Sequence, residues 1–313
     1  MPQSRPALGS AILCVGALTM DTIYRMTKLP DGPGKFLPLD AVEVAEGMAA
    51  SAAASIARLG GRVALWTSVG DDAVGERLLA AMAAEGVDCS PVRPVAGVPS
   101  AVAAVLVDAT GERMIVPFYH PFLWHGPVLP AGVAAGQYGA VLVDVRWPDA
   151  AAMALTTARQ VGAYGVLDAD IGLLATLARL APLASYIVAS RPGAAILSGV
   201  HDAEKAARQL ARRFDAMIVV TAGEEGSFWA QAGSDDIHHT PAFKIEAIDT
   251  TAAGDVFHGA FALGLVEGME GEELVRFAAA AAAVKCTRFG GRLGAPTRLE
   301  TEALLKGSPK PSA

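Results

Sequence analysis

The chain has 313 residues, 52% of them hydrophobic, and a formal net charge of −7. This length allows one large domain with a substantial core, and the acidic balance argues against a nucleic-acid partner. We expect a cytoplasmic protein without a disulfide framework or a membrane span, because the three cysteines lie far apart and the sequence has neither a long apolar stretch nor a signal-peptide pattern.

Apolar strands alternate with helices along most of the chain. The first strand is expected at Ile12–Gly16, and an Ala-rich helix at Met48–Leu59 ends at a Gly-Gly pair. The further strands are expected at Val63–Thr67, Val141–Asp144, Gly165–Leu167, Ile187–Ala189 and Met217–Thr221, and the further helices at Glu76–Glu85, Ala150–Val161, Asp202–Arg213 and Glu272–Cys286. This alternation predicts an α/β fold with a mostly parallel sheet covered by helices on both faces.

Two stretches break the alternation. Asp21–Val44 and Ser100–Phe118 have the pattern of extended or hairpin segments, and the second is rich in β-branched residues. The turn Asp108-Ala109-Thr110-Gly111 suits a hairpin. The residues alone leave open whether these stretches form a separate small sheet or an edge hairpin on the main sheet.

The run from Asp249 to Phe261, Asp-Thr-Thr-Ala-Ala-Gly-Asp-Val-Phe-His-Gly-Ala-Phe, carries the clearest chemistry. Small residues form a turn, an acid closes it, and an apolar helical stretch follows. Unpaired N–H groups at a helix N-terminus bind phosphate, whereas a carboxylate there repels it. Asp255 therefore needs a chemical reason, such as accepting the proton of a hydroxyl that attacks phosphorus. The structural alternative is a capped helix start packed with small residues.

This run resembles the second fingerprint of the PfkB (ribokinase-like) carbohydrate kinases. The resemblance implies one ribokinase-like domain over residues 1–313, with a small β-sheet lid at about residues 21–45 and 98–120 that closes over the sugar. It implies that ATP donates its γ-phosphoryl group to a sugar hydroxyl, with Asp255 as catalytic base and the N–H groups of Ala252, Ala253 and Gly254 as the anion hole. It also implies Mg²⁺ as cofactor and a homodimer formed through the lid.

No residue is assigned as a direct metal ligand. Activation by K⁺ stays open, because a K⁺ site in this family uses mainly backbone carbonyls, which a sequence barely records.

Positions near the first strand extend the resemblance to the sugar site. Asp21 matches the family's Asp that holds sugar hydroxyls, since a carboxylate can accept two of them. Gly47 matches the second residue of a Gly-Gly pair that faces the sugar, and Glu46 replaces the first. The family's Asn is Ser51 here. We expect Asp21, Gly47 and Ser51 to bind substrate; the alternative for Asp21 is a turn or cap.

A second glycine-rich element points to the nucleotide. Thr221-Ala222-Gly223-Glu224-Glu225-Gly226 matches a Thr-x-Gly-x-x-Gly element that lines the nucleotide phosphates in the family. Gly lets backbone approach phosphate, and Thr221 can donate its hydroxyl. We therefore expect Thr221, Gly223 and Gly226 to bind ATP, although strand-to-helix turns are often Gly-rich.

One family feature is missing. The Asn-x-x-Glu element would fall at Ser190-Arg191-Pro192-Gly193, and ketohexokinase-like members also lack it. Segments that start at Asp144, Pro241, Asp255 and Lys285 look like those of bacterial sulfofructose kinases. In those enzymes a Lys and an Arg hold the sulfonate, and the matching positions are Lys35 and Arg146. Two cations on one anion are physically reasonable, and the alternative is a pair of surface charges.

The substrate that these features favour is a ketose, such as 6-deoxy-6-sulfofructose or a fructose derivative. An Asn expected in the strand after Arg113 is Pro117 here, which removes one donor from a sulfonate site. Two other functions stay open. One is an adenosine-like nucleoside kinase, with Phe118, Tyr119 and Phe122 as a slot for the base. The other is a non-catalytic sugar-binding protein on a kinase fold.

Overall fold

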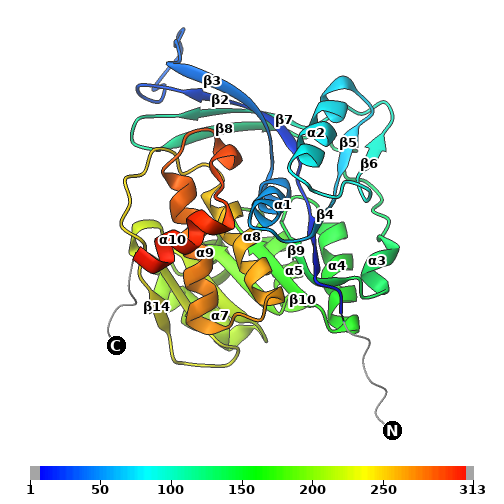
Figure 1. The fold of residues 1–313 in the computed structure, drawn as a ribbon, viewed down its shortest axis with the longest axis vertical. Coiled ribbons are helices and arrows are strands. Elements are labelled where there is room, and N and C mark those ends of the chain that lie inside the picture. The colour runs from blue at the N-terminus through cyan, green and yellow to red at the C-terminus, as the bar shows by residue number, and fades with distance from the viewer. Residues whose placement is uncertain (1–7, 308–313) are drawn as a thin grey trace.

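The computed structural model describes residues 8–307. The main sheet has eight strands in the order β14-β13-β12-β11-β10-β9-β1-β4 (Figure 1). The strands from β4 to β12 are parallel, and β13 and β14 continue the sheet in antiparallel fashion. Their bounds are β1 (Ala11–Val15), β4 (Val63–Trp66), β9 (Tyr138–Val143), β10 (Tyr164–Ala169), β11 (Tyr186–Ser190), β12 (Met217–Thr221), β13 (Ser227–Ala230) and β14 (His238–Thr240). The predicted mostly parallel sheet is confirmed.

Helices cover both faces of this sheet, as the burial of β1 illustrates. Ile12 and Cys14 enter one core layer and Leu13 and Val15 the other, because alternate side chains of a strand point to opposite faces. The first layer contains α1 (Met48–Arg58), α2 (Ala73–Ala84), α8 (Ala253–Val266) and α9 (Gly271–Cys286); the second contains α3 (Ala131–Ala134), α4 (Pro148–Val161), α5 (Leu174–Leu180), α6 (Arg191–Ser198) and α7 (Ala203–Arg213). The last helix is α10 (Arg298–Gly307).

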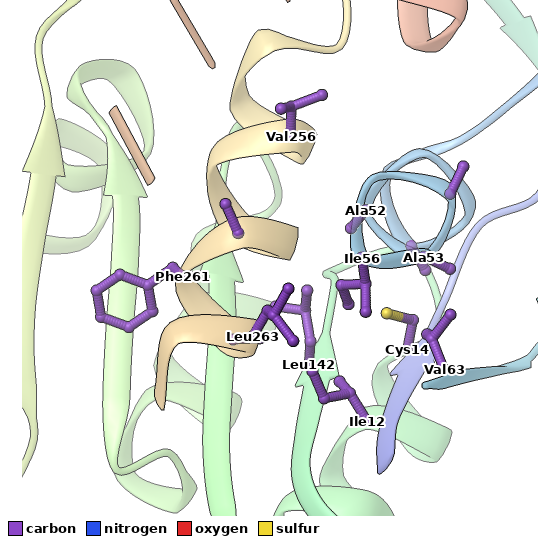
Figure 2. Close-up of a cluster of buried hydrophobic side chains, with 14 of the residues drawn as sticks. Ile12, Cys14, Ala52, Ala53, Ile56, Val63, Leu142, Val256, Phe261 and Leu263 are labelled. Carbon is purple, nitrogen blue, oxygen red and sulfur yellow. The ribbon is translucent and has the colours of Figure 1, made fainter. Parts of the chain in front are cut away.

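The first core layer joins the sheet to the two helices that frame the candidate site. Figure 2 shows Ile12 and Leu142 on the sheet and Ile56 of α1 and Leu263 of α8 pointing into the same space. Gly259 lets α8 lie against α1, since a Cβ there would lie 2.5 Å from the main-chain oxygen of Ala52. This contact fixes the first turn of α8 relative to the start of α1.

A second sheet of four strands, in the order β3-β2-β7-β8, lies over one end of the main sheet (Figure 1). Its strands are β2 (Thr19–Arg25), β3 (Asp40–Glu46), β7 (Val102–Val107) and β8 (Arg113–Phe118). It is thus a separate sheet and not an edge hairpin on the main sheet. β2 and β3 pair in antiparallel fashion as the expected hairpin, and residues 26–39, with their prolines and glycines, form the loop between them. A two-stranded sheet of β5 (Ser68–Gly70) and β6 (Arg93–Val95) completes the fold.

The four-stranded sheet, which we call the lid, packs on the body through one face. Ile23, Val44, Val105 and Val107 form a small core there, with Phe289 packed against it. The opposite side is open at β8, where Met114, Val116 and Phe118 are exposed on one face of the strand. Among the described residues no helix is both long and apolar enough to cross a bilayer. Because β1 ends at Val15 and β2 of the lid begins at Thr19, the lid lies at the carboxyl ends of the parallel strands, where ligands bind in open α/β sheets.

Candidate active site

Charged groups from separate elements meet between the lid and the main sheet. The pKa of Tyr119, which follows β8, indicates that these groups lie close together. Burial raises this pKa to about 12. The guanidinium of Arg146 opposes this rise, and the carboxylates of Asp21, Asp144 and Asp255 add to it. Because such effects weaken with distance, these groups surround one common space. The predicted residues Asp21, Arg146 and Asp255 are therefore brought together.

The loop before α8 has an unusual backbone. Ala252 has φ 60° and ψ 8°, and no other non-glycine residue of the described chain has a positive φ. This left-handed conformation costs an L-residue about 1–2 kcal/mol, and such strain clusters at functional sites. Here it turns the chain directly before α8, which begins at Ala253.

The predicted N–H donors of this loop differ in availability. The N–H of Ala253 donates to the main-chain oxygen of Thr250 at 3.2 Å. The N–H of Gly254 has no protein acceptor within residues 8–307, and no atom lies within 4 Å of where a Cβ of Gly254 would be. An anion can therefore approach Gly254 directly, with the positive end of the helix dipole behind it.

Asp255 lies in the first turn of α8 among other carboxylates. Burial raises its pKa well above the usual value, the carboxylates of Asp168, Glu46 and Asp170 raise it further, and His258 opposes them. A carboxylate with a raised pKa is a stronger base once it is ionised. The surroundings of Asp255 therefore suit a proton acceptor.

His258 and Asp168 form a buried pair behind Asp255 that the sequence does not reveal. Nδ1 of His258 lies 2.6 Å from the main-chain oxygen of Gly254, and Nε2 lies 3.1 Å from that of Val188 and 3.3 Å from Oδ1 of Asp168. The ring thus ties the first turn of α8 to the ends of β10 and β11. His258 was visible only as part of the resemblance to sulfofructose kinases.

Asp21 lies on the lid strand β2 with one oxygen held and one open. Thr19 donates its hydroxyl to Oδ1 of Asp21 at 2.5 Å, and Oδ2 makes no hydrogen bond to the part of the chain that the structure describes. Burial raises the pKa of Asp21 to about 6, and the bond from Thr19 opposes that rise. The open oxygen can accept a ligand hydroxyl, as predicted.

Ser51 and Gly47 are occupied by packing. The hydroxyl of Ser51, which is fully buried, donates to Oε2 of Glu46. Gly47 has φ 108°, and a Cβ there would lie 2.5 Å from the main-chain oxygen of Ala17. The sugar contacts of these two residues stay predictions.

Asp144 is a second residue whose role the sequence did not show. Its Oδ2 accepts the N–H groups of Ala17 at 2.7 Å and Ala49 at 3.2 Å, and its Oδ1 accepts that of Arg146 at 2.8 Å. It joins the end of β1, the start of α1 and the segment after β9. Gly16 permits this, because a Cβ there would lie 2.1 Å from the carboxylate. Asp144 therefore sets the position of Arg146.

The two predicted anion-binding cations lie in different surroundings. Arg146 is half-buried, and its guanidinium makes no hydrogen bond or ion pair with residues 8–307. Lys35 is exposed in the loop between β2 and β3. This loop begins after Arg25, the last residue of β2, and ends before Asp40, the first residue of β3. No contact in the described chain joins Lys35 to Arg146. Only Arg146 is placed with the other site residues, so the role of Lys35 stays a prediction.

The glycine-rich turn after β12 lies at the same end of the sheet. Gly223 has φ 60° with open space beside it, whereas a Cβ at Gly226 would lie 2.2 Å from the main-chain oxygen of Thr240. The hydroxyl of Thr221 lies 3.4 Å from the main-chain oxygen of Ala189. The turn therefore presents a bare backbone surface at Gly223 that a phosphate can approach.

The position of the missing Asn-x-x-Glu element is filled by another arrangement. Ser190 accepts the N–H of Gly193 at 3.1 Å, which caps α6, and donates to Oδ1 of Asp170 at 2.6 Å. Oδ1 of Asp168 is buried without a hydrogen bond. In the described residues no group of three or more His, Cys, Asp or Glu side chains could hold a metal ion. A metal here would thus need ligands from elsewhere, such as nucleotide oxygens and water.

Comparisons with known proteins agree with this geometry. A family model described as pfkB family carbohydrate kinase matches residues 10–298. The chain is 31% identical to the ribokinase of Haemophilus influenzae, with 88% of this chain and 92% of that protein covered, and 31% identical to a fructokinase of Klebsiella pneumoniae, with 77% and 80% covered. A crystal structure of a putative ribokinase from Agrobacterium tumefaciens is 44% identical, with a TM-score of 0.91 over 96% of this chain and 98% of that one.

Proposed function

The chain belongs to the pfkB family of carbohydrate kinases, and from that premise we propose that it phosphorylates a ketose that carries an anionic group, with 6-deoxy-6-sulfofructose as the best candidate and other fructose derivatives next. The observation that carries this choice is the unpaired, half-buried guanidinium of Arg146 beside Asp21 and Tyr119. A guanidinium can bind an anionic group through two N–H groups, and it needs a partner when partly buried.

The reaction that this geometry supports is an in-line phosphoryl transfer. Asp21 holds sugar hydroxyls, and Asp255 accepts the proton of the attacking hydroxyl. The N–H groups in the first turn of α8, that of Gly254 above all, stabilise charge on the transferring group. Positioning and charge stabilisation supply most of the rate in such reactions.

ATP is the proposed phosphoryl donor, with its phosphates between the Thr221–Gly226 turn and α8. A structure of Arabidopsis thaliana ribokinase that resembles this fold was solved with ribose and ATP bound. The exposed backbone at Gly223 and the free N–H of Gly254 fit phosphate groups. Mg²⁺ bound with ATP neutralises charge on the phosphates. Asp168 and Asp170, near the end of β10, fit a role in holding it through water.

The lid supports the proposal of a homodimer. The outer side of β8 exposes Met114, Val116 and Phe118 together, and exposed apolar groups of this kind mark interaction surfaces. Sedimentation of Val116→Glu against the wild type tests this, and an unchanged dimer or a monomeric wild type would contradict it.

The experiment that tests the substrate is coupled ADP release with ATP, Mg²⁺ and a panel of fructose, 6-deoxy-6-sulfofructose, fructose 6-phosphate, ribose, 2-keto-3-deoxygluconate and adenosine. We expect an anionic ketose to give the highest kcat/KM. In Arg146→Gln this preference over fructose should fall about tenfold or more, mainly through KM. Arg212→Gln is the control, because Arg212 pairs with Asp235 on the exposed surface of α7. An unchanged preference in Arg146→Gln would contradict the anionic substrate.

A neutral pentose or ketose is the second candidate. Pro117 in β8 offers no side-chain donor, and the relatives at about one-third identity are a ribokinase and a fructokinase. A higher kcat/KM for ribose or fructose than for the anionic sugars would favour it. Preference for adenosine would favour a nucleoside kinase. The position of Tyr119 argues against that function, because its ring packs on that of Trp124, with 5.0 Å between the ring centroids. Sugar binding without any ATP turnover would favour a non-catalytic protein.

A further inference from the structure

A buried lysine lies beneath the loop that leads to α8. Lys285, in the last turn of α9, has an exposure of 0%. Its Nζ lies 2.6 Å from the main-chain oxygen of Asp249, 3.3 Å from that of Arg288 and 3.3 Å from Oδ2 of Asp249. All three neighbours are acceptors, and an ammonium has three donors and no acceptor. Burial lowers the pKa of Lys285 and Asp249 opposes that shift, and the three acceptors match the three donors of the charged form.

The carboxylate of Asp249 completes this cluster. Its Oδ2 accepts the N–H groups of Gly290 and Gly291, each at 3.0 Å, and its Oδ1 accepts that of Thr251 at 2.8 Å. Burial acts to raise the pKa of Asp249, but the Lys285 ammonium and these N–H groups together hold it below the usual value. The pair is thus charged on both sides and hydrogen-bonded throughout, which a buried ion pair requires.

The cluster joins two segments that are distant in sequence. One is the start of the phosphate-side loop at Asp249, and the other is the turn at Arg288–Gly291 after α9. The main-chain oxygen of Cys286 also accepts the N–H groups of Ile248 at 2.8 Å and Asp249 at 3.2 Å. Three residues after Asp249 comes Ala252, whose strained backbone sets the direction of the free N–H of Gly254. The cluster is therefore where that loop is anchored.

Main-chain oxygens that surround one positive charge are also the ligands of a bound monovalent cation. A K⁺ ion at this place would need the oxygens that Nζ of Lys285 already contacts, and its charge would lie against the ammonium. The residues present thus do not fit a K⁺ ion between these two segments.

We propose that the ammonium of Lys285 is a built-in cation that takes the place of a dissociable monovalent cation beneath the phosphate-side loop, so that phosphoryl transfer by this chain does not depend on K⁺. The inference rests on the proposed kinase function. Lys285 is a positioning residue, because it contacts the loop and no reacting atom.

The first test uses the wild-type protein. Turnover is measured with the best sugar, ATP and Mg²⁺ in buffers whose monovalent cation is tetramethylammonium, Na⁺, K⁺ or NH₄⁺ at equal ionic strength. We expect kcat to agree within about twofold, a difference far below that of losing one transition-state donor. Activation of the wild type about tenfold or more by K⁺ would overturn the inference and leave the kinase function intact. No turnover of any sugar in any buffer would instead contradict the proposed function.

The second test removes the charge. In Lys285→Met we expect kcat to fall about a hundredfold, as for a displaced oxyanion donor, and K⁺ or NH₄⁺ to restore about tenfold of it while tetramethylammonium restores none. The midpoint of thermal unfolding is a second readout, which does not depend on turnover. K⁺ and NH₄⁺ should raise this midpoint for Lys285→Met and not for the wild type.

Lys306→Met is the matched control, because the side chain of Lys306 is 81% exposed on α10. It should show the kcat and the ion response of the wild type. A folded Lys285→Met with wild-type kcat, or one that no cation rescues in either readout, would overturn the inference. If Lys285→Met does not fold, the ion series on the wild type decides.

Discussion

Two buried carboxylates flank the candidate site, and they differ in what surrounds them. Asp249, under the phosphate side, faces an ammonium and three N–H groups, and these hold its pKa below the usual value although burial opposes them. Glu46, under the sugar side, is equally hidden, but burial raises its pKa to about 7 in spite of bonds from Ser51 and Arg292. Burial is common to both, so the nearest charge decides which carboxylate stays ionised.

The difference assigns the two sides different tasks. The phosphate side must keep one geometry while the phosphoryl group is transferred. An ion pair whose hydrogen bonds are all made is rigid. The sugar side adjoins a lid, and a carboxyl whose pKa lies near 7 changes charge easily. Asp255 is coupled to the sugar side, since the carboxylate of Glu46 is among the groups that raise its pKa. The following variants test this contrast.

The largest effect is expected from Asp255→Asn, which removes the proton acceptor and leaves both flanking carboxylates in place. We expect kcat to fall about 10²–10⁴-fold, the range of general-base catalysis, while the Kd for ATP stays nearly unchanged. Turnover and calorimetric ATP binding measure this. Asp215→Asn is the control, because its carboxylate is 86% exposed in the loop after α7. Near-wild-type kcat in Asp255→Asn would reject Asp255 as the base.

Asp249→Asn breaks the phosphate-side pair. It leaves the ammonium of Lys285 buried without its carboxylate, and removing one partner of a buried pair costs about 3–5 kcal/mol. Urea unfolding at neutral pH measures the loss, with Asp215→Asn again as the control. A loss below about 1 kcal/mol, typical of an exposed pair, would mean that Asp249 does not hold Lys285 in place.

These two residues also show what the sequence could predict. The stretch Asp249–Asp255 is contiguous, so the sequence alone predicts its turn, its helix start and its acid. The pairing of Asp249 with Lys285 joins residues 36 positions apart, and that of Asp144 with Ala17 joins residues 127 apart. No local pattern encodes such contacts, because they depend on how the strands and helices pack.

On the sugar side too, the sequence does not reveal the contacts that hold the site residues in place. The motif predicts sugar contacts for Ser51 and Gly47, and it does not show that Ser51 bonds to Glu46 or that Gly47 packs closely on Ala17. Glu46 was noticed only as a departure from a glycine. Its partner Arg292 lies 246 residues further along the chain, so its buried network is invisible without the fold.

Glu46→Gln sharpens the contrast through pH. Because the folded-state pKa of Glu46 is about 7, above the ordinary 4.5, the stability it contributes is full below about pH 4.5 and is lost as pH rises through 7. The variant cannot ionise, so its free energy of unfolding should exceed that of the wild type by about 1–3 kcal/mol near pH 8, and the gap should close near pH 5. Urea unfolding at both pH values measures this. A gap that does not depend on pH would contradict a buried, titrating Glu46.

The smallest effect is expected above the phosphate-side loop, where the lid touches it. Arg113, exposed at the start of β8, donates to the main-chain oxygen of Thr250 at 3.0 Å, and Thr250 donates its hydroxyl to the main-chain oxygen of Gly111 at 3.2 Å. Exposed hydrogen bonds of this kind contribute about 0.5–1.5 kcal/mol, so Arg113→Gln should lower kcat/KM only about two- to tenfold, with Arg212→Gln as the control. The same loop is held from below by Lys285, whose bonds are buried. A loss in Arg113→Gln as large as that in Lys285→Met would mean that the lid, and not the buried ammonium, sets the position of the loop.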